Sequence, residues 1–340
     1  MPRERLPEAM AVPFPEGFPR IPDEPWTRAP VDEFARRYDA LGGHSWYANL
    51  EPTVAAAAPL ARDGGVLVDY SCGTGLFLER LLRAAGDEAF GAVNVDSSAK
   101  FLRLALEKRR DDPRVAFRLL RMDHGQQRLQ YLHEVLGPLV GKVAAIVSTN
   151  AMHLYYDLDA TVASWARCLR PGGLVLAQSG NVPVEAGAEG SWTLDATVEA
   201  VARAAESVVR EDAAYARWRA TLADPSRRSA YLALRRKYFL PPRPLSAYRL
   251  AMEGAGLRVE SVERRPVTVR VDEWAQFLDV YHEGILGWVG GSEKVDGKPA
   301  SDEDVRARRT LLRRAVERVF SDRPTFEATW TYVTARSPLG

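Results

Sequence analysis

The sequence predicts an α/β protein built on a doubly wound parallel sheet that carries helical insertions. From Gly65 onward, short apolar runs alternate with amphipathic helical patterns, as in parallel strands joined by crossover helices. The first apolar run leads into a turn of small residues at 71–75, directly before a helical pattern. Two long stretches, at 183–244 and about 272–324, interrupt the alternation with mainly helical patterns, which indicates insertions.

The N-terminal segment differs from the rest in its proline content. Residues 1–30 contain eight prolines, so this arm cannot be helical and is expected to be extended. It is either disordered or wrapped around the domain through Phe14, Phe18 and Trp26. In the next segment, 31–47, aromatic and aliphatic residues spaced by four and three predict a helix that breaks at 42–43.

The central part alternates strictly between the two element types. Apolar runs predict strands at 66–68, 92–95, 115–120, 143–148 and 174–179. Amphipathic patterns predict helices at 76–85, 99–109, 127–136 and 158–169, with a turn at 170–173. Five strands separated by four helices in this order predict the doubly wound sheet.

The C-terminal part resumes the alternation after the first insertion. We expect a helix at 245–255, strand segments at 257–262 and 267–271, and a final strand at 326–334. Within the second insertion, Ser301 followed by Asp304 predicts a helix start with a capping box. The predicted organisation is therefore an arm and helix at 1–48, a core at 49–182, a helical insertion at 183–244, and a second part of the core at 245–340.

Composition and charge exclude several classes of protein. Of 340 residues, 46% are apolar and 27% are charged, which is typical of a globular chain. The net charge of +1 provides no general field for a phosphate backbone, so no nucleic-acid partner is expected. Two cysteines, Cys72 and Cys168, are too few for a disulfide framework. With no signal-peptide pattern and no apolar run of membrane-spanning length, we expect a cytoplasmic protein without a membrane partner.

The segment 69–75, Asp-Tyr-Ser-Cys-Gly-Thr-Gly, carries the strongest functional signal. Small residues at the mouth of a first parallel strand let backbone amides approach a ligand closely. The segment resembles the first motif of the class I S-adenosylmethionine-dependent methyltransferases, Asp-Leu-Gly-Cys-Gly-Thr-Gly. Two positions depart from that motif: Tyr70 replaces a small aliphatic residue, and Ser71 replaces a glycine. Cofactor binding therefore requires Ser71 to adopt a backbone angle that glycine takes easily.

Four further matches follow in the family's order and extend the resemblance over about residues 60–180. Asp96 lies 21 residues after Gly75, at the end of the second predicted strand, where a carboxylate can accept hydrogen bonds from both ribose hydroxyls. Asp123 follows the third strand. The segment 150–153, Asn-Ala-Met-His, follows the fourth strand, and 169–173, Leu-Arg-Pro-Gly-Gly, precedes the fifth.

The resemblance implies S-adenosyl-L-methionine as the cofactor and a seven-stranded, Rossmann-like methyltransferase sheet with the insertions as a lid. The implied cofactor-binding residues are Asp69, Ser71, Cys72, Gly73, Gly75, Asp96, Ser97, Asp123, His124 and Asn150. Within this set, Asp123 is implied to contact the adenine amino group, and Asn150 the methionine part. The alternative roles are a helix N-cap for Asp96 and a surface pair with His124 for Asp123.

His153 is the candidate catalytic residue, because the resemblance places it near the methyl group that is transferred. It is the best-placed base for an oxygen or acidic carbon nucleophile. Packing, orientation of the substrate and helix capping are its alternative roles. The other histidines show no metal-ligand spacing, so no metal site is expected.

The substrate is expected to be a small organic molecule of secondary metabolism, with O- or C-methylation favoured over N-methylation. The insertions and the N-terminal segment supply many aromatic residues, as suits a lid over a flat molecule. The candidate substrate-binding residues are Tyr38, Tyr47, His153, Tyr281, His282 and Trp288. A monomer or a homodimer is expected.

Two alternative functions remain open from the sequence. One is methylation of protein or RNA. The other is binding of S-adenosylmethionine without methyl transfer, in a scaffold or in a catalyst of a rearrangement. A nicotinamide-dependent oxidoreductase is disfavoured, because a Tyr-x-x-x-Lys pair is absent.

Overall fold

The computed structural model describes residues 14–183, 192–321 and 323–340. The first 13 residues of the proline-rich arm and residues 184–191 of the first insertion therefore lie outside the described residues. None of the helices in the described ranges is long and apolar enough to cross a membrane.

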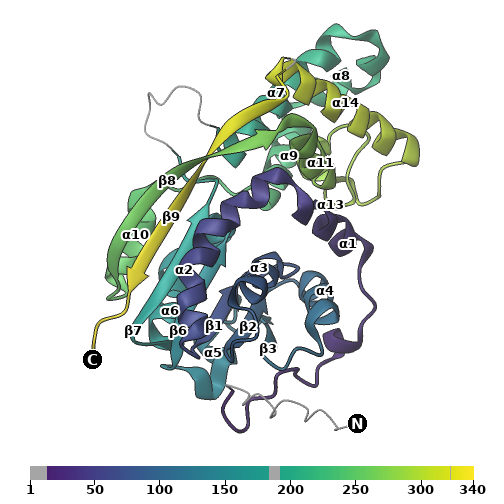
Figure 1. Ribbon diagram of the computed structural model, residues 1–340. Coiled ribbons are helices and arrows are strands. Elements are labelled where there is room, and N and C mark those ends of the chain that lie inside the picture. Colours follow the sequence, from purple (N-terminus) through teal and green to yellow (C-terminus); the bar gives the residue numbers. More distant parts are fainter. Residues whose placement is uncertain (1–13, 184–191, 322) are drawn as a thin grey trace, which may run out of the picture.

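Seven strands form one sheet in the order β3-β2-β1-β6-β7-β9-β8, which confirms the predicted fold class (Figure 1). The strands are β1 (Val66–Tyr70), β2 (Gly91–Asp96), β3 (Val115–Leu119), β6 (Val143–Thr149), β7 (Leu169–Ser179), β8 (Arg258–Arg270) and β9 (Thr325–Arg336). The pairs from β3 to β7 are parallel, whereas β9 runs antiparallel to both of its neighbours. A separate hairpin is formed by β4 (Met122–Asp123) and β5 (Arg128–Leu129).

Helices cover both faces of the sheet, and a second group of helices lies beyond one end of it (Figure 1). The α-helices are α1 (Glu33–Ala40), α2 (Glu51–Arg62), α3 (Leu76–Ala85), α4 (Ala99–Arg109), α5 (Leu132–Leu136), α6 (Leu158–Cys168), α7 (Leu194–Glu211), α8 (Arg219–Ala223), α9 (Pro225–Tyr238), α10 (Leu245–Gly254), α11 (Val271–Val280), α12 (His282–Leu286), α13 (Glu293–Asp296) and α14 (Asp302–Phe320). Short 3-10 helices lie at Pro25–Arg28, Leu41–Gly43, Ser45–Leu50, Gly137–Leu139, Met152–Leu154 and Ala213–Trp218.

Two apolar cores lie against the two faces of the sheet. Helices α2, α3 and α4 contribute to one core, together with β1, β2 and β3. Helices α5, α6 and α10 contribute to the other, in which Trp165 is almost completely buried. The strand order reverses at β1, between β2 and β6, and open α/β sheets bind ligands outside the carboxyl ends of the strands at such a point.

A third core joins the two insertions to the end of the sheet. It contains buried residues of α7, α9, α11, α12 and α14, together with aromatic residues of the segment 46–50 and of β9. Strand β9 is 12 residues long and joins this core to a core of the sheet. Its Trp330 belongs to the third core, and its Val333 belongs to the core that contains α5, α6 and α10. The two insertions are therefore anchored over the carboxyl edge of the parallel strands. Together we call them the lid.

Three expected elements differ from the structure. The helix expected at 127–136 begins only at Leu132, because Arg128 and Leu129 pair with the preceding residues in the β4–β5 hairpin. The segments 257–262 and 267–271 form one strand, β8, that continues through Pro266. Proline is tolerated there because β8 is the edge strand of the sheet. The turn expected at 170–173 is an irregular start of β7.

The described part of the arm packs on the domain. Phe18 stacks with Phe14 and lies under the guanidinium group of Arg118, 3.8 Å from the ring centre. The amide of Phe117 donates a hydrogen bond to the carbonyl of Arg20, and Trp26 is buried in the core beside α2 and α3. Residues 14–30 thus wrap the domain through the aromatic residues that the sequence singled out.

Candidate functional site

The loop between β1 and α3 has an unusual backbone, which suits close approach of a ligand. Ser71, Gly73 and Gly75 have φ angles of 62°, 55° and 87°. Ser71 thus adopts the left-handed conformation that glycine takes without strain and other residues rarely adopt. Such strain is found where the surrounding structure or a ligand requires it.

Asp96, at the end of β2, connects this loop to the next helix. Its Oδ2 accepts a hydrogen bond from the amide of Gly73 at 2.8 Å, and its Oδ1 accepts one from the amide of Ser98 at 2.7 Å. Ser98, and not Asp96, caps α4 through its side chain. Each carboxylate oxygen can accept a further hydrogen bond, so Asp96 retains capacity for two hydroxyl donors.

Asp69 lies beside Asp96 and is buried without a hydrogen-bond partner for either carboxylate oxygen among the described residues. Burial, together with the negative charge of Asp96, raises the pKa of Asp69 to about 8. The side chains of Thr74 and Asn94, nearby in the loop and in β2, also have unpartnered buried atoms. Unpartnered buried polar groups are costly, so this cluster fits a ligand with a cationic group and several hydrogen-bonding groups.

Asp123 and His124 lie on the β4–β5 hairpin. Oδ1 of Asp123 accepts hydrogen bonds from the amides of Gly125 and Gln126, which shapes the hairpin turn, and His124 is exposed. An ion pair between Arg128 of β5 and Glu134 of α5 braces the hairpin.

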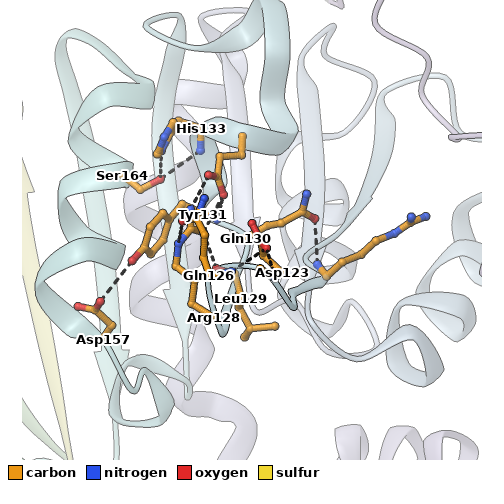
Figure 2. A network of polar contacts seen from close by, with 12 residues as sticks. Asp123, Gln126, Arg128, Leu129, Gln130, Tyr131, His133, Asp157 and Ser164 are labelled. Carbon is orange, nitrogen blue, oxygen red and sulfur yellow. Dashed lines mark hydrogen bonds and ion pairs between the residues drawn. The ribbon is translucent and has the colours of Figure 1, made fainter.

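The same network extends from the hairpin to α6. The hydroxyl of Tyr131 donates to Asp157 at 3.2 Å, and the guanidinium group of Arg128 stacks on the Tyr131 ring (Figure 2). These contacts hold Asp123 at the edge of the sheet next to the end of β3.

Asn150, after β6, also has a positive φ, of 55°. Its Oδ1 accepts a hydrogen bond from the indole of Trp330 at 2.7 Å, and its Nδ2 donates to Oδ1 of Asn49. Asn49 also accepts a hydrogen bond from Gln178. Asn150 therefore connects β6, β7, β9 and the segment before α2 at the carboxyl edge of the sheet.

His153 lies close to Asn150 and is almost fully buried. Its Nδ1 is 2.8 Å from the hydroxyl of Ser179, at the end of β7, and that hydroxyl also accepts a hydrogen bond from the amide of Asn181. Burial and the positive charge of Arg243 lower the pKa of His153 to about 4, so its imidazole is neutral near pH 7.

A cavity of about 110 Å³ opens beside His153 and Asn150, under the lid. Most of its lining is aromatic, and the polar side chains besides tyrosines and tryptophans are Asn150, His153 and Asn181. The lining residues are Tyr38, Trp46, Asn150, His153, Leu154, Gly180, Asn181, Leu194, Tyr238, Phe239, Trp274, Phe277, Tyr281 and Trp330. Desolvation and the negative charge of Asp96 raise the pKa of Tyr38, which lines the cavity.

The structure brings some of the predicted substrate residues to this cavity and places others elsewhere. Tyr38, His153 and Tyr281 line it. Tyr47 lies behind it, stacked on Trp46 with ring centres 3.8 Å apart.

The last two predicted substrate residues face other parts of the lid. The ring of His282 lies 3.4 Å from the guanidinium group of Arg308 in α14. Trp288 lines a different, smaller cavity with Tyr231 and Arg235 of α9. Among the described residues, no group of three or more His, Cys, Asp or Glu side chains could hold a metal ion.

Ser179, Asn181 and Trp330 are site residues that the sequence interpretation missed. A signal was present for the first two, because 179–181 directly follows the fifth parallel strand, at the edge where such sheets bind ligands. No comparable signal existed for Trp330, which reaches the site from the antiparallel strand β9.

Gly180 packs against the indole of Trp330, and a substitution at Gly180 tests how tight this packing is. A Cβ atom added there would lie 2.7 Å from two atoms of the Trp330 indole. We expect Gly180→Ala to lower the free energy of unfolding by about 1–3 kcal/mol, because the indole is held by Asn150 and cannot move away. Denaturant unfolding measures this change. Gly254→Ala, which meets open space in α10, is the matched control and should be neutral or stabilising; equal effects of the two variants would contradict the packing.

Comparison with known proteins identifies the family. A family model described as a methyltransferase domain matches residues 44–262, more than half of the chain. The chain therefore belongs to the methyltransferase-domain family, and it is a class I S-adenosylmethionine-dependent methyltransferase. A search of curated protein sequences gives no match.

Solved structures with a similar backbone have low sequence identity. A putative methyltransferase from Bacillus halodurans C-125 is 14% identical, with a TM-score of 0.47 over 84% of this chain and 98% of that one. A putative sarcosine dimethylglycine methyltransferase from Galdieria sulphuraria is 12% identical, with a TM-score of 0.48 over 90% and 99%. The cyclase SpnF is 16% identical, with a TM-score of 0.44 over 84% and 81%. At these identities the likeness concerns the fold alone.

The cofactor is S-adenosylmethionine, and the residues of the β1–α3 loop fit its chemistry. The unpartnered Asp69 suits a ligand with positive charge, and Asp96 has room for two hydroxyl donors. The cofactor, when bound, supplies a methyl group on a reactive sulfonium, so the protein has to align the acceptor and exclude water.

Proposed function

We propose that this methyltransferase acts on a small organic molecule, of the kind found in secondary metabolism, and that it methylates oxygen or carbon in preference to nitrogen. The observation that carries the proposal is the aromatic cavity beside His153 and Asn150. In this proposal, Asp69, Ser71, Cys72, Gly73, Gly75, Asp96, Ser97, Asp123, His124 and Asn150 serve the cofactor, and the cavity holds the acceptor.

The lining of the cavity supports a small, flat and largely apolar acceptor. The described part of the lining carries eight aromatic side chains and no carboxylate, lysine or arginine side chain. Aromatic rings contribute large apolar contact areas, and a few polar groups fix orientation. A cavity under a lid also excludes water from the reacting groups.

A macromolecular acceptor is the less well supported alternative. A protein or RNA chain would have to insert a residue beneath the lid, and the net charge of +1 offers no general attraction to a nucleic acid. We retain the cytoplasmic location and the monomeric or homodimeric state as predictions.

The proposed function is tested by methyl transfer from S-adenosylmethionine with a labelled methyl group. The acceptors are phenols, 1,3-dicarbonyl compounds and aromatic amines in one panel, and total protein and total RNA in another. We expect label in the small molecules, with phenols or dicarbonyl compounds ahead of amines. Label that enters only protein or RNA would overturn the proposal, and binding of cofactor with no transfer to any acceptor would favour the non-methylating alternative.

Narrowing the cavity is expected to block the acceptor and spare the cofactor. Leu154 lines the cavity and is 42% exposed, so a larger side chain there does not disturb a core. Leu154→Trp is expected to lower kcat/KM for the acceptor by about tenfold or more, because an obstructed acceptor loses its alignment. The affinity for S-adenosylmethionine, measured by calorimetry, should not change.

Leu250→Trp is the matched control for this variant. Leu250 is 68% exposed on α10 and does not line the cavity. It should leave both kcat/KM and cofactor affinity unchanged. Equal losses of kcat/KM in the two variants would show that the cavity is not the acceptor site.

A further inference from the structure

We propose that His153 and Asn181 form a pair of hydrogen-bond donors that hold an oxygen atom of the methyl acceptor, with Ser179 fixing the position of the proton on His153. The inference rests on the proposed function, because it takes the aromatic cavity as the acceptor site. It assigns His153 a role opposite to that of a general base: the ring donates a hydrogen bond and does not accept a proton.

The hydroxyl of Ser179 is fully buried, and its hydrogen bonds are defined. Oγ accepts a hydrogen bond from the amide of Asn181 at 2.9 Å. The only other hydrogen-bond partner of Oγ among the described residues is Nδ1 of His153, at 2.8 Å. The hydroxyl hydrogen therefore has one acceptor within reach in the described part of the chain, which is Nδ1.

This arrangement selects one tautomer of the imidazole. If Nδ1 carried the proton, it would donate to Oγ, and the buried hydroxyl hydrogen of Ser179 would have no acceptor among the described residues. Leaving the buried hydroxyl donor unsatisfied is costly, whereas the opposite tautomer pairs both the hydroxyl and Nδ1 and moves the ring proton to Nε2. Nδ1 is thus the acceptor, and Nε2 carries the proton.

The Nε2–H group has no hydrogen-bond partner among the described residues, and the ring lines the aromatic cavity. The ring is also kept neutral. The guanidinium group of Arg243 reaches the backbone carbonyl of His153 at 3.5 Å, and its positive charge opposes a second proton on the ring. A neutral imidazole that donates from one nitrogen can polarise or hold an oxygen atom.

Asn181 provides the second donor. Its Oδ1 accepts a hydrogen bond from the amide of Asp195, at the start of α7, at 2.8 Å. That contact determines which end of the amide is oxygen. Nδ2 is buried and has no partner among the described residues, and Asn181 is one of the residues that line the same cavity.

The two donors define the chemical class of the acceptor. It carries a carbonyl oxygen or an ionised hydroxyl on a flat conjugated framework, because the cavity offers unpartnered N–H groups and aromatic faces. Among the described residues, the cavity lining contains no carboxylate or amine that could remove a proton. The acceptor therefore enters as an acidic phenol or a 1,3-dicarbonyl compound that loses its proton in solution, and the two donors stabilise its negative charge.

The tautomer is tested by NMR of protein with ¹⁵N-labelled histidine rings, near pH 7 and without any acceptor. His153→Gln identifies the signals of His153 among those of the five histidines. We expect a protonated Nε2 and an unprotonated Nδ1. We expect Ser179→Ala to weaken this preference, because Nδ1 loses the hydroxyl donor. A protonated Nδ1 with a free Nε2, or a doubly protonated ring, would overturn the inference.

The donor pair is tested with 4-nitrophenol, whose ionised and neutral forms absorb at different wavelengths, in the presence of S-adenosylhomocysteine. We expect the bound phenol to have a lower apparent pKa than the free phenol, because the donors favour the anion. Asn181→Asp keeps the Oδ1 that caps α7 and replaces the Nδ2 donor by an oxygen, so it should abolish this shift. Failure of the parent protein to bind 4-nitrophenol, or preference for its neutral form, would contradict the donor pair.

Turnover of the acceptor found in the labelling panel separates the two roles of His153. The amide nitrogen of glutamine reaches the position of Nε2, whereas that of asparagine reaches the position of Nδ1. If His153 is a donor, His153→Gln retains more turnover than His153→Asn and His153→Ala; if it is a base, all three are equally impaired. Cofactor affinity is measured on the same proteins. This measurement tests the proposed function independently of the role of His153.

Discussion

Replacing Asp96 by alanine is expected to weaken the binding of S-adenosylmethionine by about 1–3 kcal/mol, which is roughly 5-fold to 150-fold in Kd. The side chain holds the amides of Gly73 and Ser98, so it shapes the loop as well as offering acceptors to the ribose hydroxyls. Hydrogen bonds to a charged group are stronger than those between neutral groups, and the variant loses them together. Calorimetric titration with S-adenosylmethionine measures the loss.

One further variant separates the effect of charge from that of side-chain volume at position 96, and another variant serves as a control. Asp96→Asn keeps the volume but can place an amide N–H against one of the two backbone amides, so it should bind the cofactor nearly as weakly as the alanine variant. Glu88→Ala changes an exposed residue before β2 that is not in the proposed cofactor set, and it should keep normal affinity. Unchanged affinity in Asp96→Ala would remove Asp96 from the cofactor site.

Replacing Asp69 by asparagine is expected to stabilise the ligand-free protein at pH 8 and above, and to weaken cofactor binding. Burial raises the pKa of this carboxyl from 3.8 to about 8 in the folded protein. Between these values the folded state binds more protons than the unfolded state, so its stability falls as the pH rises. Asparagine removes this dependence, and the stability gained at pH 8 is on the order of 5 kcal/mol.

Unfolding by denaturant at a series of pH values measures the difference between the parent protein and Asp69→Asn. The difference should grow from about pH 4 upward and level off above pH 8, and it should vanish only below about pH 3, where the parent carboxyl is neutral in both states. Calorimetry on the same variant should show a higher Kd for S-adenosylmethionine, because the buried negative charge is lost. A pH-independent difference, or tighter binding by the variant, would contradict the role of Asp69 as an unpaired buried carboxylate.

The sheet and its first loop could be predicted from the sequence because their signals are local. Helices α3 and α4 have the predicted bounds, since glycine and small residues precede one and an Asp-Pro pair follows the other. The requirement placed on Ser71 is also met, because its φ is positive. The β4–β5 hairpin was missed because residues 127–136 have helical spacing, and its two short strands are stabilised mainly by pairing with each other.

The cavity under the lid was only partly predictable, because it depends on how distant segments pack. The sequence placed Tyr38 and Tyr281 near the substrate, and both line the cavity. It could not show that α12 turns His282 toward Arg308 and Trp288 toward α9. Nor does the sequence indicate that the indole of Trp330, on the last strand, donates a hydrogen bond to Asn150.

The most direct test of the account is a calorimetric titration of the purified protein with S-adenosylmethionine, S-adenosylhomocysteine and, as a control, NADH. Binding of both sulfur compounds at micromolar concentration, with no binding of NADH and with loss of affinity in Asp96→Ala, is the result that the account predicts. Absence of binding by either sulfur compound, or equal binding of NADH, would contradict the assignment of the β1–α3 loop and Asp96 as the cofactor site.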